Sequence, residues 1–272
     1  MFRRKPFFLF ILENGIIWYN HCMAMHDRKD LILEILRNHS RFVTVEQLSE
    51  KLFVSGATIR RDLADLEKSK LVQRTRGGAI LLESISTEAP MVLRETRNEM
   101  QKQIIATIAR EYIKDGMTIF MDSSSTVFTL ARNLSHIGNL TVITNNLKIT
   151  WLLSGHKGVT LFCTGGWLKE RSMSFFGPST VQYINRLNAD AAFISAMGFT
   201  FENGSTDASE EDYYVKRAYI SNSKKKYLLA DTSKHGKEFM YRTSPLSAFT
   251  RVVTESRELN ERLIELTKPT DA

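Results

Sequence analysis

The stretch from residue 55 to residue 79, SGATIRRDLADLEKSKLVQRTRGGA, constrains the fold most strongly. Ser55 is a good N-cap residue, because its hydroxyl can accept a hydrogen bond from an amide in the first turn of a helix. Ile59 and Leu63 then recur at the spacing that stacks side chains on one helical face. Arg61 lies about 200° around the helix from Ile59 and points away from that face. The stretch therefore predicts a helix that is buried on one side and basic on the other.

Two more helices are predicted before this one, and a hairpin after it. Apolar residues at positions 31, 32, 35 and 36 indicate the first helix. Thr44 caps the second, with Gln47 completing a capping box. The hairpin is predicted as a strand at 71–73, a turn at 74–78 and a strand at 79–82. Gly77 and Gly78 would let the backbone approach another backbone closely. This order of elements predicts a winged helix-turn-helix over residues 25–82.

Basic side chains are concentrated in this segment. The chain of 272 residues has a formal net charge of +7. Residues 51–78 contain seven Lys or Arg and three Asp or Glu, so this stretch alone contributes +4. A basic patch on a helix and a hairpin is typical of a protein that binds double-stranded DNA. The alternative is a solvated basic surface without a ligand. The residues expected to contact bases or phosphates are Lys51, Ser55, Thr58, Arg60, Arg61, Arg74 and Arg76.

Cysteine and histidine spacing argues against a metal site and for a reducing compartment. The two cysteines, Cys22 and Cys163, are far apart in sequence, and neither lies in a metal-ligand motif. We therefore expect no metal, no cofactor and a cytoplasmic location. Residues 1–24 resemble a poor secretory signal, because the apolar run at 7–12 is short. We expect this extension to be an artefact of start-site choice, with translation beginning at Met23 or Met25; a weak membrane-surface anchor is the alternative, and no membrane association is expected.

The chain changes character after the hairpin. Residues 83–97 include a polar stretch ending in Pro90 and are predicted as a linker. From residue 98 to 272, apolar runs alternate with helical patterns, which indicates a mainly parallel sheet covered on both faces. The fold class is thus α/β, with a Rossmann-like second domain. The six predicted strands are 117–121, 140–144, 159–163, 191–196, 227–230 and 249–253.

Polar residues follow five of these strands. In open parallel sheets, ligands bind at the carboxyl ends of the strands, and a helix N-terminus there favours an anion such as phosphate. Each cluster taken alone could simply cap a helix or form a turn. Asp212, four residues before Lys216, could form an ordinary surface pair with it or hold that ammonium for a ligand. The expected effector-binding residues are Asp122, Ser123, Ser124, Ser125, Thr126, Asn145, Gly165, Gly166, Asp207, Lys216, Asp231 and Lys234.

A known family shares these motifs. The segments VSGATIRRDLADLEKSKLVQRTRGGA, MDSSST, VITNN, CTGG, FFGPS, AMGF, EEDYYVKR and LLADTSKHGK occur in this order. They resemble the DeoR family of bacterial transcriptional regulators over about residues 27 to 255. The resemblance implies a winged helix-turn-helix joined to a sensor domain of the ribose-phosphate isomerase and CoA-transferase type. It also implies a repressor that senses a phosphorylated sugar and forms a homo-oligomer, a dimer or a tetramer.

Three positions depart from the pattern of that family. Ser124 stands where glycine is usual, Arg76 where histidine is usual, and Asp212 where glutamate is usual. Two other functions stay open from the sequence: a sugar-phosphate isomerase or acyl transferase that uses the second domain, and a regulator that responds to a protein partner. Against the enzyme, no P-loop or G-x-G-x-x-G motif follows a strand. We therefore expect a repressor of carbohydrate-metabolism genes that is relieved by a phosphorylated sugar and is not an enzyme.

Overall fold

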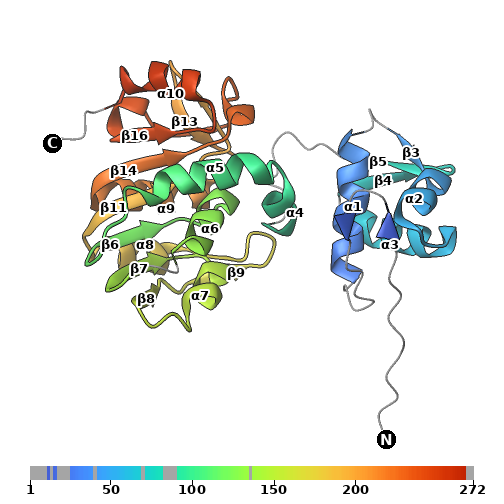
Figure 1. The fold of residues 1–272 in the computed structure, drawn as a ribbon, viewed down its shortest axis with the longest axis horizontal. Coiled ribbons are helices and arrows are strands. Elements are labelled where there is room, and N and C mark those ends of the chain that lie inside the picture. The colour runs from blue at the N-terminus through green and yellow to red at the C-terminus, as the bar shows by residue number, and fades with distance from the viewer. Residues whose placement is uncertain are drawn as a thin grey trace, which may run out of the picture. The chain divides into compact units, whose positions relative to one another are not determined.

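The computed structural model describes residues 11–12, 15–16, 25–38, 42–68, 71–81, 91–134 and 137–267. The chain forms two compact units, Met1–Ile85 and Ser86–Ala272 (Figure 1). The residues described before position 25 form a short antiparallel pair, β1 (Ile11–Leu12) and β2 (Gly15–Ile16). The prediction about the start of translation lies outside the described residues.

Three helices form the core of the first unit: α1 (Met25–Asn38), α2 (Val45–Leu52) and α3 (Gly56–Lys68). The Thr44–Gln47 capping box is present at the start of α2, as predicted. Ile59 and Leu63 are buried at 0% and 1% exposure, which confirms the inward face predicted for α3. Across the bundle, the Arg28 guanidinium pairs with the buried Asp62 carboxylate at 2.5 Å. The amphipathic pattern and the cap therefore form this bundle as expected.

A three-stranded sheet completes the first unit, with β3 (Val43–Thr44), β4 (Val72–Thr75) and β5 (Gly78–Leu81) in the order β3-β5-β4. The turn is tighter than predicted. Only Arg76 and Gly77 form it, because Thr75 already pairs with Gly78. Gly77 has a φ of +89°, which favours glycine. A Cβ at Gly78 would lie 2.2 Å from the Val43 carbonyl oxygen, so the close backbone approach predicted here is confirmed.

Part of the segment expected to be a linker is a helix of the second unit. α4 (Met91–Thr96) begins directly after Pro90, and α5 (Glu99–Arg110) follows it. Met91 is fully buried in the core of this unit, and its backbone N–H donates to the Arg171 carbonyl at 2.8 Å. Buried contacts of this kind fix residues 91–96 to the second unit rather than leaving them as a tether.

A six-stranded sheet organises the second unit, and all five neighbouring pairs are parallel. The strand order is β16-β14-β11-β6-β7-β8. All six predicted apolar runs became strands of this sheet. Their bounds are β6 (Thr118–Met121), β7 (Leu140–Thr144), β8 (Val159–Cys163), β11 (Ala189–Ile194), β14 (Ser223–Leu229) and β16 (Arg251–Val253).

Helices cover both faces of the sheet (Figure 1). Ile119 and Met121 of β6 belong to a core that includes residues of α5, α6 (Ser125–Arg132) and α7 (Leu147–Leu153). Phe120, the intervening residue, belongs to a second core that includes residues of α8 (Pro178–Ile184), α9 (Glu210–Ser221) and α10 (Arg257–Ile264). Successive side chains of a strand point to opposite faces, so both faces are apolar. This confirms the predicted parallel sheet with two covered faces.

Shorter elements connect the main strands and helices of this unit. β9 (Trp167–Lys169) and β10 (Ser174–Phe176) form one antiparallel pair. β12 (Gly198–Thr200), β13 (Gly204–Asp207) and β15 (Tyr241–Ser244) form an antiparallel sheet. Two single-turn helices are η1 (Thr232–Lys234) and η2 (Leu246–Ala248). Within the described ranges, no helix is long and apolar enough to cross a bilayer.

Candidate functional site

A cavity of about 160 Å³ lies where β6, β11 and β14 end. Residues from the start of α6, the end of β11 and the turn after β14 line it, together with residues of the α4–α5 segment. Basic side chains dominate the lining, with one carboxylate, Asp231. The lining residues are Arg94, Arg97, Asn98, Lys102, Ser124, Ser125, Ser195, Ala196, Met197, Lys216, Asp231, Ser233, Lys234, Lys237 and Phe239.

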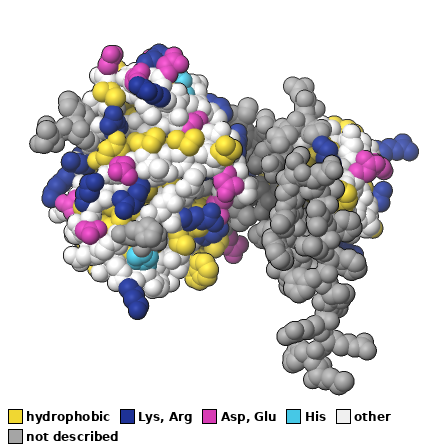
Figure 2. Space-filling view, in the orientation of Figure 1, with side chains coloured by type: hydrophobic (Ala, Val, Ile, Leu, Met, Phe, Trp, Pro, Cys, Tyr) yellow, Lys and Arg dark blue, Asp and Glu magenta, His cyan; other side chains and the backbone are white. Residues whose placement is uncertain are grey.

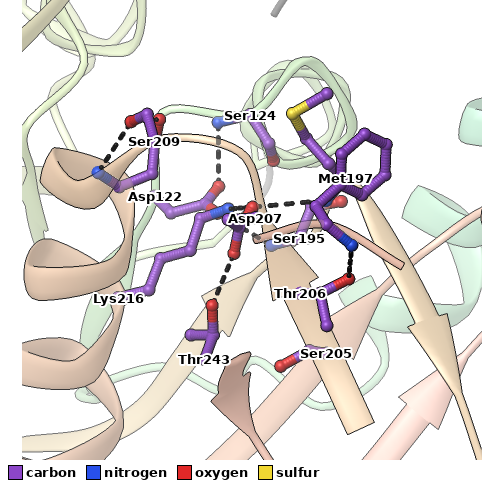
Figure 3. A network of polar contacts seen from close by, with 12 residues as sticks. Asp122, Ser124, Ser195, Met197, Ser205, Thr206, Asp207, Ser209, Lys216 and Thr243 are labelled. Atoms are coloured by element: carbon purple, nitrogen blue, oxygen red, sulfur yellow. Dashed lines mark hydrogen bonds and ion pairs between the residues drawn. The ribbon is translucent and has the colours of Figure 1, made fainter. Parts of the chain in front are cut away.

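Asp122 holds two walls of this cavity together. One carboxylate oxygen accepts from the backbone N–H of Ser124 at 2.9 Å, and the other accepts from the backbone N–H of Ser195 at 2.8 Å (Figure 3). Ser124 in turn caps α6, since its hydroxyl accepts from the Val127 N–H at 3.1 Å. Burial raises the pKa of Asp122. Asp122 is absent from the lining, so it positions the first turn of α6 rather than facing a ligand.

Lys216 enters the cavity from α9 and forms a buried ion pair. Its Nζ lies 2.5 Å from Oδ1 of Asp207, and the two side chains are 7% and 2% exposed. Asp207 also accepts from the Thr243 hydroxyl at 2.7 Å and from the Met197 N–H at 3.2 Å (Figure 3). Burial lowers the pKa of Lys216, but the neighbouring carboxylates, with Asp207 first, raise it above its usual value. Lys216 is therefore a cation at neutral pH.

Asp212 is one of those neighbouring carboxylates. It is 7% exposed, and its backbone N–H donates to the N-cap hydroxyl of Ser209 at 3.1 Å. The interpretation of Asp212 and Lys216 as an ordinary surface pair is wrong, because both residues are buried. The ion pair that Lys216 makes through a bond of 2.5 Å goes instead to Asp207, which lies on β13. The antiparallel sheet that contains β13 was not predicted, so this pairing could not be anticipated.

A second group of charges surrounds Asp231. Its carboxylate accepts from Asn98 Nδ2 at 2.9 Å, while Lys234 Nζ donates to the Ser195 hydroxyl at 2.8 Å. Burial raises the pKa of Asp231, but Lys234, Ser233, Asn98 and Lys102 together bring it below the usual value. Burial is also the main reason why the pKa of Lys234 is lowered. These residues form one polar wall of the cavity. Asp231 is the one carboxylate among the residues that line it.

Lys102 is a cavity residue that the sequence did not reveal. It is 4% exposed, and its Nζ donates to the backbone carbonyls of Arg94 and Arg97. Burial and the nearby charge of Lys234 lower its pKa to about 7. Arg94, Arg97 and Asn98 were missed as well, because they fall within the predicted linker or directly after it. Three cations within nine residues, next to a predicted helix, were the available signal.

Several predicted effector residues do not line this cavity. Asn145 is fully buried, with Nδ2 donating to the Phe175 carbonyl and Oδ1 accepting from the Tyr219 hydroxyl. A Cβ at Gly166 would lie 2.4 Å from the Phe176 carbonyl oxygen, so close packing explains why glycine occupies this position. The cavity is thus formed at fewer strand ends than the five that were predicted to line the crevice. The predicted residues that are absent from the lining are Asp122, Ser123, Thr126, Asn145, Gly165, Gly166 and Asp207.

The predicted DNA-contacting side chains lie on α2, α3 and the hairpin. Arg60 and Arg61 are exposed on α3, and Arg76 is exposed in the hairpin turn. Ser55 caps α3, accepting from the Thr58 N–H at 3.2 Å, and its hydroxyl lies 2.9 Å from the Thr58 hydroxyl. The remaining two are also exposed: Lys51 at the end of α2 and Arg74 on β4. Arg74 belongs to a strand rather than to the turn, as its backbone pairing with Ala79 shows.

The charges on the outer surface of the second unit are distributed differently from those that line its cavity. Basic and acidic side chains are interspersed over its visible face (Figure 2). Around the cavity, in contrast, six lysines and arginines accompany one carboxylate in the lining. Among the described residues, no group of three or more His, Cys, Asp and Glu is placed to hold a metal ion. The cavity lining thus combines an excess of basic side chains with hydroxyl groups and the N-terminus of α6.

Two family models match the two units. Residues 28–85 match the DeoR-like helix-turn-helix domain, and residues 97–256 match the DeoR C-terminal sensor domain. The chain belongs to the DeoR family. Within this family of DNA-binding transcriptional regulators, the first unit is the helix-turn-helix domain and the second is the sensor domain. The resemblance identified from the motifs is confirmed.

Named DeoR-family relatives are regulators. The chain is 35% identical to the uncharacterized HTH-type transcriptional regulator YulB of Bacillus subtilis, over 86% of this chain and 90% of the relative. It is 34% identical to the HTH-type transcriptional repressor GlcR of the same organism, over 86% and 89%. The glycerol-3-phosphate regulon repressor of Escherichia coli is 30% identical, over 86% and 92%. These matches span both domains.

Proposed function

We propose that this DeoR-family regulator represses carbohydrate-metabolism genes and that a phosphorylated sugar relieves the repression by binding in the sensor cavity. The observation that carries the proposal is the meeting of the α6 N-terminus with Lys216 and Lys234 around one cavity. Phosphate is a natural ligand for such a helix N-terminus combined with lysines. The relatives named as repressors, GlcR and the glycerol-3-phosphate regulon repressor, support the direction of regulation.

In this proposal the phosphate lies at the first turn of α6, beside Ser124 and Ser125. The Ser124 hydroxyl already caps the helix, so the remaining first-turn amides supply the anion-binding end. Lys216 and Lys234 neutralise the phosphate charge from the opposite elements. Asn98, Asp231 and Ser233 offer donors and acceptors for sugar hydroxyl groups. The cavity binds its ligand without converting it, which fits relatives that are regulators.

On the DNA side, α3 enters the major groove, where Arg60, Arg61 and Thr58 contact base edges. Lys51, Arg74 and Arg76 hold phosphates and set the register of the domain on the duplex. A homodimer or homotetramer in the cytoplasm presents two or more copies of α3 to repeated half-sites. The effector lowers the affinity for DNA because it binds better to the state whose helix-turn-helix domains do not match the half-site spacing.

The test is fluorescence anisotropy on a duplex that the protein has selected from a random-sequence pool, with a random duplex as control, at one fixed salt concentration. A panel of sugar phosphates is then titrated into the complex. We expect one compound to release the selected duplex, and Lys234→Met to weaken that response while leaving DNA affinity unchanged. Sequence-specific binding that no sugar phosphate affects would contradict the effector role, and absence of any sequence preference would contradict the regulator.

A further inference from the structure

Phe53, in the turn between α2 and α3, is an unusual residue for its position. It is the C-cap of α2, with φ 53° and ψ 39°, and its N–H donates to the Ser49 carbonyl. This left-handed conformation crowds the Cβ of an L-residue and suits glycine or asparagine. A bulky aromatic side chain in it is an outlier. The backbone of the turn therefore does not explain why a phenylalanine is present.

Packing does not explain the phenylalanine either. Its side chain is 91% exposed, the highest value among the large exposed hydrophobic residues of the described segments. The other exposed aromatic residue in the described part of the first unit, Phe42, is better covered: it is 44% exposed and lies against Gly78. A ring in water contributes no burial to the fold, and its backbone is strained. Strained residues that give the fold nothing are found at functional positions.

The position of Phe53 in the chain places it beside the DNA-contacting helix. It precedes Ser55, the N-cap of α3, by two residues, and two residues of extended chain span at most about 7 Å. The N-terminal residues of such a helix are the ones that contact base edges. A ring at the preceding turn is therefore within reach of the edge of the groove when Thr58 and Arg61 are in it.

We propose that Phe53 contacts a thymine methyl group at the edge of the operator half-site and contributes to sequence preference. This proposal rests on the DNA-binding function of α3. The major-groove face of a T·A pair exposes the C5-methyl group, and a phenylalanine ring is one of the apolar groups that contact it. The contact buries the ring only in the complex, which accounts for an exposed ring in the free protein.

The experiment compares Phe53→Asn, Phe53→Tyr and the wild type on the duplex selected by the wild-type protein from a random pool. Asparagine tolerates the left-handed conformation, so Phe53→Asn is expected to melt at the same temperature or higher. Its affinity for the selected duplex is expected to fall five- to tenfold, with little change on random DNA. Phe53→Tyr keeps the ring and is expected to bind within twofold of the wild type. Trp151→Ala, which removes an exposed aromatic ring of the sensor domain, is the matched control.

The same duplex with uracil in place of thymine tests the methyl contact directly. We expect the wild type to lose several-fold in affinity on the uracil duplex and Phe53→Asn to lose clearly less, because its contact is already absent. Equal losses in the two proteins, or unchanged affinity of Phe53→Asn for the thymine duplex, would overturn the proposal. Failure of the wild type to select any sequence would instead overturn the DNA-binding function on which it rests.

Discussion

The ammonium group of Lys216 and the carboxylate of Asp207 form an ion pair of 2.5 Å inside the sensor domain, with both side chains at least nine-tenths buried. Removing one partner of such a pair leaves the other charged and without its counterion, which is far more costly than losing an exposed pair. Lys216 of this pair also lines the cavity, whereas Asp207 lies behind it and holds the ammonium in place.

Lys216→Met should therefore lower the free energy of unfolding by about 3–5 kcal/mol. Lys216→Met combined with Asp207→Asn should lower it by less than the sum of the two single changes, because neither charge is left alone. Lys224→Met is the matched control. It removes the exposed pair with Asp190, whose side chains are 76% and 37% exposed, and should cost about 0–1 kcal/mol. Urea denaturation followed by circular dichroism measures the two single changes of the pair, their combination and the control, and equal costs for Lys216→Met and Lys224→Met would contradict the prediction.

Lys102 should couple effector binding to proton uptake. Its pKa in the folded protein is about 7, so the side chain is partly neutral at pH 7 and mostly neutral at pH 8.5. An anion in the cavity favours the charged form and raises that pKa. Affinity for a sugar phosphate should fall as pH rises from 7 to 8.5, and Lys102→Met should flatten this dependence. Calorimetry in two buffers with different ionisation enthalpies measures the proton uptake directly; identical heats in both buffers would contradict it.

Lys102 also predicts how the stability of the free sensor domain depends on pH. The pKa is about 7 in the folded chain and near 10.5 when unfolded, so between these values the unfolded state binds more protons. Stability contributed by this group therefore rises as pH increases from 7 toward 10.5. The slope of unfolding free energy against pH in this window should be smaller in Lys102→Met than in the wild type, as measured by urea titrations at several pH values.

Arg61 and Arg76 should differ in their effect on specificity. Arg61→Ala should cost about 1–3 kcal/mol on the selected duplex and relax sequence preference, because its guanidinium faces outward on α3. Arg76→Ala, in the hairpin turn, should weaken binding to all sequences similarly and reduce the salt dependence. Anisotropy on selected and random duplexes at several salt concentrations separates these outcomes. Equal loss on both duplexes for Arg61→Ala would contradict its base-contacting role.

Gly78→Ala should damage the hairpin much more than Gly77→Ala. A Cβ at position 78 would lie 2.2 Å from the Val43 carbonyl oxygen, and the backbone of β3 must move to accept it. At position 77 no atom lies within 4 Å, so only the positive φ of 89° opposes alanine, at a cost of about 1 kcal/mol. Thermal melting of the two variants measures the difference, and similar melting temperatures would contradict this packing argument.

The sequence predicted the long, regular parts of both units well. Central strands of a parallel sheet are covered on both faces, so they appear as continuous apolar runs, and all six were recognised. The cap residue Ser55 and the spacing from Ile59 to Leu63 are local signals, and α3 formed accordingly. These features depend on neighbours in the chain, which a sequence pattern records.

Features that depend on distant residues were missed or drawn too broadly. β13 has the sequence GSTD, which resembles that of a loop, although all four residues are buried. α4 has only six residues after a proline, too few for a periodic pattern. The strand-end rule placed Asn145 at the correct edge of the sheet, but its side chain bonds to Phe175 and Tyr219 instead of facing the cavity. Side-chain direction at a strand end is set by tertiary partners that are not adjacent in sequence.

The hydrogen bonds from Lys102 to the carbonyls of Arg94 and Arg97 connect a side chain of the cavity lining directly to the backbone at the end of α4. A ligand that draws this ammonium toward itself must release one or both carbonyls, and the junction of α4 and α5 loses an internal brace. α4 is the first described helix after the segment joining the two units, so in the proposed mechanism a bound effector would act on the part of the sensor domain that follows this segment most directly in the chain.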